Sequence, residues 1–138
     1  MDTSIAIEDG PKATMLTIGG EVDALTTPAL ARAIRASLDR GRVHFVIDLK
    51  AVSYIDSCGL GLLISTLKAV AARRGSMRIV VVDARLRRLF QSTGLDHMLP
   101  LHQDVKEAVA TAKRAASTLH VQPYSADADD RFASLIVS

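Results

Sequence analysis

The sequence predicts an α/β domain, in which four α-helices cover a mixed β-sheet of four or five strands, in the order β-β-α-β-α-β-α-β-α. Two short segments, 4–8 and 13–18, flank a turn with Gly and Pro and indicate a hairpin. Two apolar runs rich in β-branched residues, 43–49 and 78–82, are typical of buried strands. Between the strands, apolar residues recur every three or four positions, which predicts helices. A hairpin followed by βα units forms a mixed sheet with helices covering it.

The composition narrows the class of protein. The chain has 138 residues, 49% hydrophobic and 23% charged, which suits one globular domain with a sizeable core. A net charge of +2 gives no support for direct binding to nucleic acid. The single cysteine excludes an intramolecular disulfide. We expect no signal peptide, and the most apolar window is shorter than the roughly 20 residues that cross a bilayer. The sequence therefore predicts a soluble cytoplasmic protein with no membrane contact.

The first half of the chain is expected to fold as follows. Residues 19–23 leave the hairpin, and the first helix begins at Thr26-Thr27-Pro28, with a hydroxyl cap followed by a proline that needs no N–H donor. Gly41 ends that helix. Its core face carries apolar residues four positions apart: Leu30, Ile34 and Leu38. The run 43–49 is the central strand, and a helix at 60–72, closed by Gly75, follows it.

The second half continues the alternation. Asp83 caps a short third helix, and residues 98–101, which include a proline, form an edge strand. Residues 104–107 resemble a capping box that opens the last helix. The domain is predicted to span 1–117, and the polar, turn-rich segment 118–138 is predicted to be a flexible tail. The apolar residues at the end of this tail either dock on the domain or on a partner, or form a frayed end.

The candidate site is the hexapeptide 56–61, Asp-Ser-Cys-Gly-Leu-Gly. It places the hydroxyl of Ser57 where a strand gives way to a helix, and the amides and dipole of a helix N-terminus favour a negative group. Ser57 is therefore a candidate phosphorylation site, or else an ordinary helix cap. Asp56 either caps the helix, positions the hydroxyl or repels phosphate. Gly59 and Gly61 permit a tight backbone and the close approach of another chain.

Other chemistry finds little support. Cys58 is either an oxidisable thiol or a small half-buried filler. The four histidines lack metal-ligand spacing, and neither a phosphate-binding loop nor a Gly-x-Ser-x-Gly elbow is present. We therefore expect no enzyme activity, no catalytic residue, no metal and no cofactor.

The element order, together with segments 20–23, 55–61 and 86–95, resembles the STAS domain over residues 4–115, most closely the bacterial anti-sigma factor antagonists. The resemblance implies partner switching in stress response. An unphosphorylated antagonist binds an anti-sigma factor that is also a serine kinase, which frees a sigma factor for transcription. The kinase then phosphorylates the loop serine, and a serine phosphatase reverses the step.

Carried over residue by residue, the resemblance makes Ser57 the phosphoacceptor, with Asp56 and Asp23 as its acidic neighbours. Family members commonly carry Ser, Thr or Ala where this chain has Cys58, which leaves a redox question open. The residues expected to contact the partner are Asp23, Asp56, Ser57, Cys58, Gly59, Leu60 and Gly61. Two alternatives stay open: a scaffold subunit of a stress-sensing complex, and a domain that binds a nucleotide or small ligand.

Overall fold

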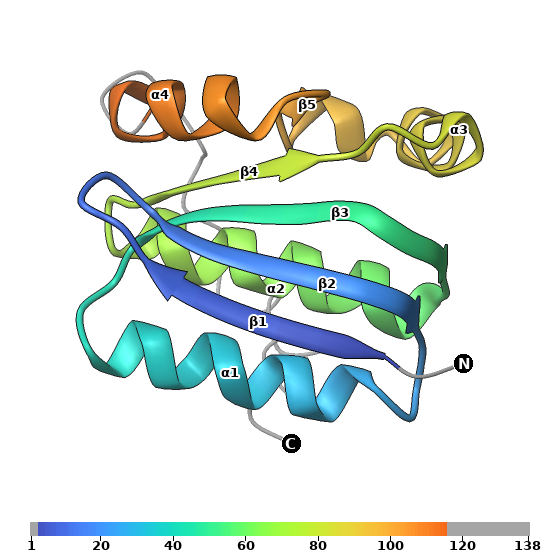
Figure 1. Cartoon of the computed structure of the whole chain (residues 1–138), viewed down its shortest axis with the longest axis horizontal. Helices are drawn as coiled ribbons and strands as arrows, with labels where there is room; N and C mark the ends of the chain where they lie inside the picture. Colours follow the sequence, from blue (N-terminus) through green and yellow to red (C-terminus); the bar gives the residue numbers. More distant parts are fainter. Residues whose placement is uncertain (1–2, 116–138) are drawn as a thin grey trace.

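The computed structural model describes residues 3–115 and has the predicted order of strands and helices (Figure 1). Five strands form one sheet in the order β1-β2-β3-β4-β5, in which only β1 runs antiparallel to its neighbour. The predicted boundary at residue 117 and the predicted tail at 118–138 lie outside the described residues. The elements are β1 Ser4–Asp9, β2 Thr14–Val22, α1 Thr27–Asp39, β3 His44–Ile55, α2 Ser57–Ala72, β4 Ser76–Val80, α3 Ala84–Ser92, the 3-10 turn η1 Leu95–His97, β5 Leu101–His102 and α4 Val105–Ala115.

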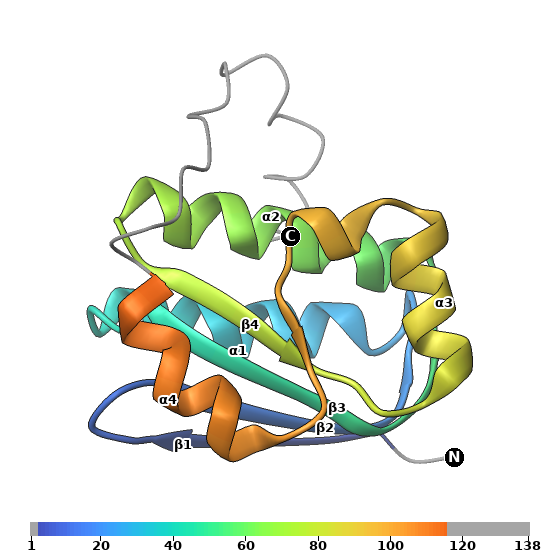
Figure 2. The same cartoon turned by 90° about the horizontal axis from the view of Figure 1, so that it is seen from above.

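The helices divide between the two faces of the sheet. Helices α1 and α2 lie on one face and α4 lies on the other, while α3 stands at one end (Figure 2). The larger core joins β2, β3 and β4 to α1, α2 and α3, and it is almost wholly aliphatic, as the scarcity of aromatics predicts. A smaller core lies under α4 and consists of Ala13, Val46, Val80, Ala108 and Ala112. The central strand β3 is therefore covered on both faces, as its apolar run predicts.

Two strands are longer than predicted. Residues 19–22 were predicted to leave the hairpin, but they continue β2, and β3 extends to Ile55 rather than ending at residue 49. The ladder between them survives because register shifts at Thr17/Gly19 and Gly20/Glu21 bring Val22 opposite Ile55. Both side chains are buried, so the ends of these strands belong to the core. Periodicity is a poor guide to a strand interrupted in this way.

The last two strands are displaced from their predicted positions, and β5 is shorter than predicted. Strand β4 occupies 76–80 rather than 78–82, and β5 is two residues long, at 101–102 rather than 98–101. Pro100 has no N–H to donate, but its carbonyl accepts a hydrogen bond from Ile79 N at 3.1 Å. The short edge strand therefore joins the sheet only where the chain has passed the proline.

Some local predictions were wrong in detail. Thr26 precedes α1, but its hydroxyl makes no cap and instead donates to Glu21 O at 3.0 Å. After α2, the left-handed residue is Arg74 (φ 59°), and Gly75 is needed because a Cβ there would collide with the Val43 carbonyl. In the predicted capping box, Asp104 Oδ1 does accept from Lys106 N at 3.1 Å, but the Glu107 carboxylate lies 2.8 Å from His102 Nδ1 on β5.

Candidate functional site

The parallel strands β2, β3 and β4 end at the same edge of the sheet, which we call the carboxyl edge (Figure 1, right). An aspartate follows shortly after each of them: Asp23, Asp56 and Asp83. Each carboxylate accepts backbone N–H bonds from residues two and three positions ahead. These residues hold the chain as it turns back from the sheet, which is the local role typical of aspartate.

Asp56 is the N-cap of α2. Its Oδ1 accepts from Cys58 N at 2.9 Å and from Gly59 N at 3.1 Å. Its own N–H donates to Val22 O at 3.0 Å, which ties the start of α2 to the end of β2. The capping interpretation of Asp56 is therefore confirmed.

Ser57 is the first residue of α2, and it is exposed. The hypothesis that Ser57 is the helix cap is wrong, because Asp56 takes that position. This changes the expectation for a negative group on Ser57. Two N–H groups that would have received it, those of Cys58 and Gly59, already bond to Asp56. A phosphate here would lie beside an occupied helix end and a carboxylate, so it would remain at the surface.

Gly59 serves the close packing of the domain itself. It is buried, and a Cβ there would stand 2.8 Å from Val22 Cγ1, 2.8 Å from Ile55 Cγ2 and 3.1 Å from Val22 O. Only glycine lets the first turn of α2 press this closely against the ends of β2 and β3. Gly61 is buried as well. The segments that approach Gly59 belong to this chain, and contact of Gly59 or Gly61 with another chain stays a prediction.

Asp23 shapes the loop that leads into α1. Its Oδ1 accepts from Leu25 N at 3.0 Å and from Thr26 N at 3.1 Å, and its N–H donates to Thr26 Oγ1 at 2.9 Å. The loop turns Leu25 outward, where 89% of the residue is exposed. Because Val22 pairs with Ile55, the loop beginning at Asp23 and the site beginning at Asp56 are neighbours.

The remaining predicted residues are less accessible. Cys58 is a free thiol and half-buried, and Leu60 is half-buried against the larger core. The filler interpretation of Cys58 agrees with this placement, whereas its oxidation stays a prediction.

The sequence pattern did not predict the exposed apolar side chains at this edge. Leu25 follows β2, Tyr54 lies near the end of β3 with 51% of its surface exposed, and Val82 follows β4 with 51% exposed. An apolar residue near the end of a strand was the only available signal, and it is weak because single exposed apolar residues are common. We define the carboxyl-edge surface as Asp23, Leu25, Tyr54 and Ser57, which come from the ends of the paired strands β2 and β3.

Within residues 3–115, no group of three or more His, Cys, Asp or Glu side chains is placed to hold a metal ion. The helices of this part of the chain include none with the length and apolar character needed to cross a bilayer.

The chain is similar to known proteins over the same region. The model of the STAS domain family matches residues 4–108. The anti-sigma-B factor antagonist of Staphylococcus aureus is 33% identical over 103 residues, which cover 75% of this chain and 95% of that protein.

Solved structures agree. An anti-sigma factor antagonist from Mycobacterium paratuberculosis superposes with a TM-score of 0.74 at 30% identity, covering 81% of this chain and 95% of that one. The Bacillus cell fate determinant SpoIIAA in its phosphorylated form gives a TM-score of 0.63 at 19% identity, covering 78% and 97% of the two chains. That second likeness is one of fold alone.

Proposed function

This chain belongs to the STAS domain family, and on that premise we propose that it is an anti-sigma factor antagonist, a regulator without catalytic activity that binds an anti-sigma factor. Capture of the anti-sigma factor frees a sigma factor, so the protein promotes transcription indirectly and acts in the cytoplasm. The relative from S. aureus, which the alignment covers almost end to end, supports this role.

The observation that carries the proposal is the exposure of Ser57 at the start of α2, next to the loop that presents Leu25. A protein partner that covers the start of α2 and this loop buries Leu25, and apolar burial of this kind contributes roughly 25 cal/mol per Å². The same partner covers the Ser57 hydroxyl. Asp56 and Gly59 contribute from beneath by fixing the first turn of α2.

Phosphorylation of Ser57 is the proposed switch. The Ser57 hydroxyl oxygen attacks the γ-phosphorus of ATP held by the anti-sigma factor, which acts as the serine kinase. The bond to ADP breaks, and the hydroxyl proton leaves with a base of the kinase. A serine phosphatase reverses the modification with water and releases inorganic phosphate.

The phosphoserine would act through charge at the surface. Phosphate adds about −1.5 to −2 charges, beside the carboxylates of Asp56 and Asp23. Because the N–H groups of Cys58 and Gly59 already donate to Asp56, they are not available as donors that would hold the phosphate against α2. The phosphate would instead meet the partner directly, and desolvating an unpaired charge in an interface is unfavourable. The solved structure of SpoIIAA in its phosphorylated form supports the idea that this fold accommodates a phosphate.

The test is a comparison of Ser57→Ala with Ser57→Asp in recovery of partners from cell extract, with mass spectrometry of the bound and unbound pools. We expect Ser57→Ala to retain the anti-sigma factor and Ser57→Asp to lose it. Ser92→Asp is the matched control, since Ser92 is an exposed serine on a different helix, α3, and receives the same charge. Equal recovery by the two Ser57 variants would contradict the switch.

A further inference from the structure

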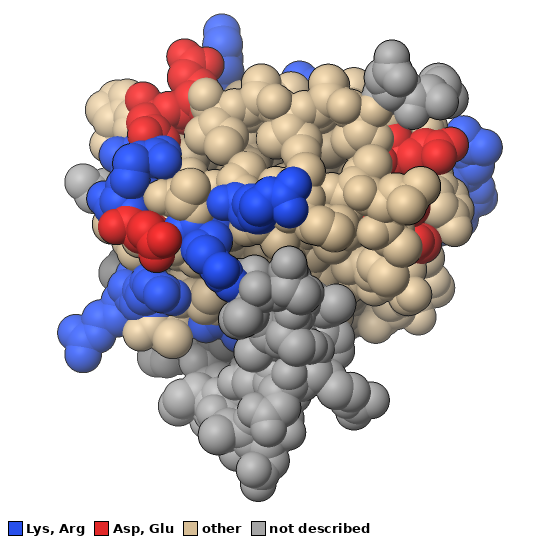
Figure 3. All heavy atoms as spheres, turned by 90° about the horizontal axis from the view of Figure 1, so that it is seen from below, with Lys and Arg blue, Asp and Glu red and all other residues tan. Residues whose placement is uncertain are grey.

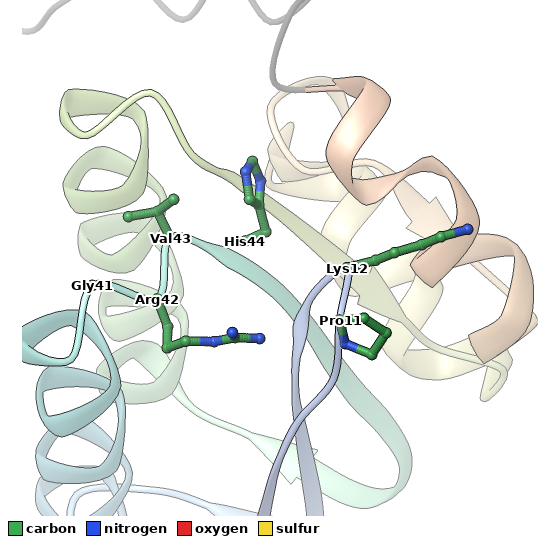
Figure 4. Close-up of a pocket in the computed structure, with 6 residues that line it drawn as sticks. All are labelled: Pro11, Lys12, Gly41, Arg42, Val43 and His44. Carbon is green, nitrogen blue, oxygen red and sulfur yellow. The ribbon is translucent and has the colours of Figure 1, made fainter.

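The end of the sheet opposite Ser57 carries two adjoining hollows, one on each side of the β1–β2 turn. The first has a volume of about 130 Å³ and lies between this turn and the α1–β3 loop (Figure 4). The second has a volume of about 200 Å³ and lies between the turn and α4. Both are lined by Pro11 and Lys12, so a segment that crosses the turn would reach the two together. We call them the basic hollow and the apolar hollow.

The basic hollow is built around a fixed guanidinium. Arg42 Nε donates to Thr14 Oγ1 at 2.7 Å and Nη2 donates to Gly10 O at 2.6 Å, which hold the group across the base of the turn. In Figure 4, Arg42 lies toward Pro11, and Lys12 extends from the turn toward α4. Among residues 3–115, no hydrogen bond is made by Arg42 Nη1, so this end of the guanidinium is available to a ligand.

Positive charge exceeds negative charge around this turn. Two carboxylates lie nearby: Asp9, which serves both Arg40, at 3.0 Å, and Arg42, at 3.7 Å, and Glu8, which lines the apolar hollow. Lys12 therefore adds a third positive charge to Arg40 and Arg42, which share the carboxylate of Asp9. Figure 3 shows Lys and Arg side chains, with Asp and Glu side chains among them, at the end of the molecule that holds this turn.

The apolar hollow has a different lining. Ala13 and Met15 of the hairpin face Val109 of α4 across it, with Glu8 at the rim. A cavity of roughly 150 Å³ lined by apolar side chains admits a benzene ring, so this hollow has room for one aromatic side chain.

The chain leaves the described structure close to the basic hollow. Ala112, in the last turn of α4, accepts a hydrogen bond from Ser76 Oγ at 2.6 Å. Ser76 Oγ in turn lies 2.9 Å from Nδ1 of His44, which lines the basic hollow. The residues that follow Ala115 therefore begin beside this site.

The segment beyond Ala115 complements both hollows. Three acidic residues, Asp127, Asp129 and Asp130, lie there with one basic residue, Arg131, so that segment carries −2 against +4 for residues 1–115. Phe132 follows two positions after the last aspartate.

We propose that residues 127–132 bind in cis across the β1–β2 turn, with the aspartates at Lys12 and Arg42 and with Phe132 in the apolar hollow. The eleven residues from 116 to 126 span up to roughly 36 Å when extended, which is ample for a site beside the exit of α4. Tethering converts the contact into an intramolecular one, so weak individual interactions suffice. The arrangement leaves the carboxyl-edge surface open.

The test uses the full chain with one nitroxide spin label, placed by Ser134→Cys in a Cys58→Ser background. We expect paramagnetic broadening of the backbone amides at 8–14 and 41–44, at least twofold stronger than at the Ser57 loop. The charge contacts are screened by salt, so the broadening should weaken in 0.5 M NaCl.

Variants identify the contacts. Lys12→Glu and Phe132→Ser should each remove most of the broadening, and Lys12→Glu combined with Asp129→Lys and Asp130→Lys should restore it. Arg88→Glu, an equal charge change at an exposed site on α3, should leave it unchanged.

Three results would overturn the proposal: no broadening at the hairpin, broadening centred on the carboxyl edge, or equal loss in Lys12→Glu and Arg88→Glu. Binding to a second copy of the chain is tested in a mixture of two samples. One carries the spin label without ¹⁵N, and the other carries ¹⁵N without the spin label. Broadening in that mixture would mean that the segment binds a second copy, which also contradicts binding in cis.

Discussion

Substitution of Asp56 separates its structural role from its charge. Asp56→Ala removes the acceptor of two N–H bonds, 2.9 Å from Cys58 N and 3.1 Å from Gly59 N. Loss of an N-cap typically costs about 1 kcal/mol of folding free energy, and leaving the two half-buried N–H groups without a protein partner is consistent with that value. For a domain of this size the melting temperature should fall by roughly 4 °C. Thermal unfolding followed by circular dichroism measures it.

Asp56→Asn is the matched control, because asparagine keeps the oxygen acceptor and is about as good an N-cap. It loses only the interaction of the charge with the helix dipole, roughly 0.5 kcal/mol at an exposed site. The alanine variant should therefore be clearly less stable than the asparagine variant. If both were destabilised equally, the charge and not the hydrogen bonds would stabilise the start of α2, and the capping argument would be refuted.

The other predictions concern neighbouring positions. Gly59→Ala should destabilise the domain by about 1–3 kcal/mol in urea titration, because overpacking against Val22 outweighs the better helix propensity of alanine; unchanged stability would contradict the close approach. Backbone bonding from Arg85 lowers the pKa of Asp83, so its stabilising contribution is present at neutral pH and is lost as the pH falls below about 4. Asp83→Asn should flatten that part of the stability–pH curve. Mild peroxide should change partner binding by the wild type and not by Cys58→Ser if the thiol is a sensor; identical behaviour would leave Cys58 as a filler.

Much of the fold could be predicted because its signals are local. Within the apolar run at 43–49, every residue from Phe45 to Leu49 is buried, which only a central strand needs. Leu30, Ile34 and Leu38 repeat every four residues and all are buried on α1. The caps Asp83 and Asp56 also follow from local chemistry, since aspartate at the junction of strand and helix satisfies the first N–H groups.

Errors arose where a partner outside the predicted element decided the outcome. The ends of β2 and β3 are strands because each supplies hydrogen bonds to the other across a shifted register, which neither segment indicates by itself. Thr26 would cap α1 in isolation, but Glu21 O and Asp23 N engage its hydroxyl instead. Glu107 would close a capping box, but His102 on β5 lies within 2.8 Å.

The candidate site shows the same division. The sequence by itself determined that a serine and an aspartate stand at a strand–helix junction, because residue type and order fix helix starts locally. Only the tertiary structure decided that Ser57 faces solvent and that Gly59 is buried against Val22 and Ile55. It also brought the hollows at the β1–β2 turn beside the exit of α4. Solvent exposure and close approach depend on how separate segments pack, and no local pattern contains that information.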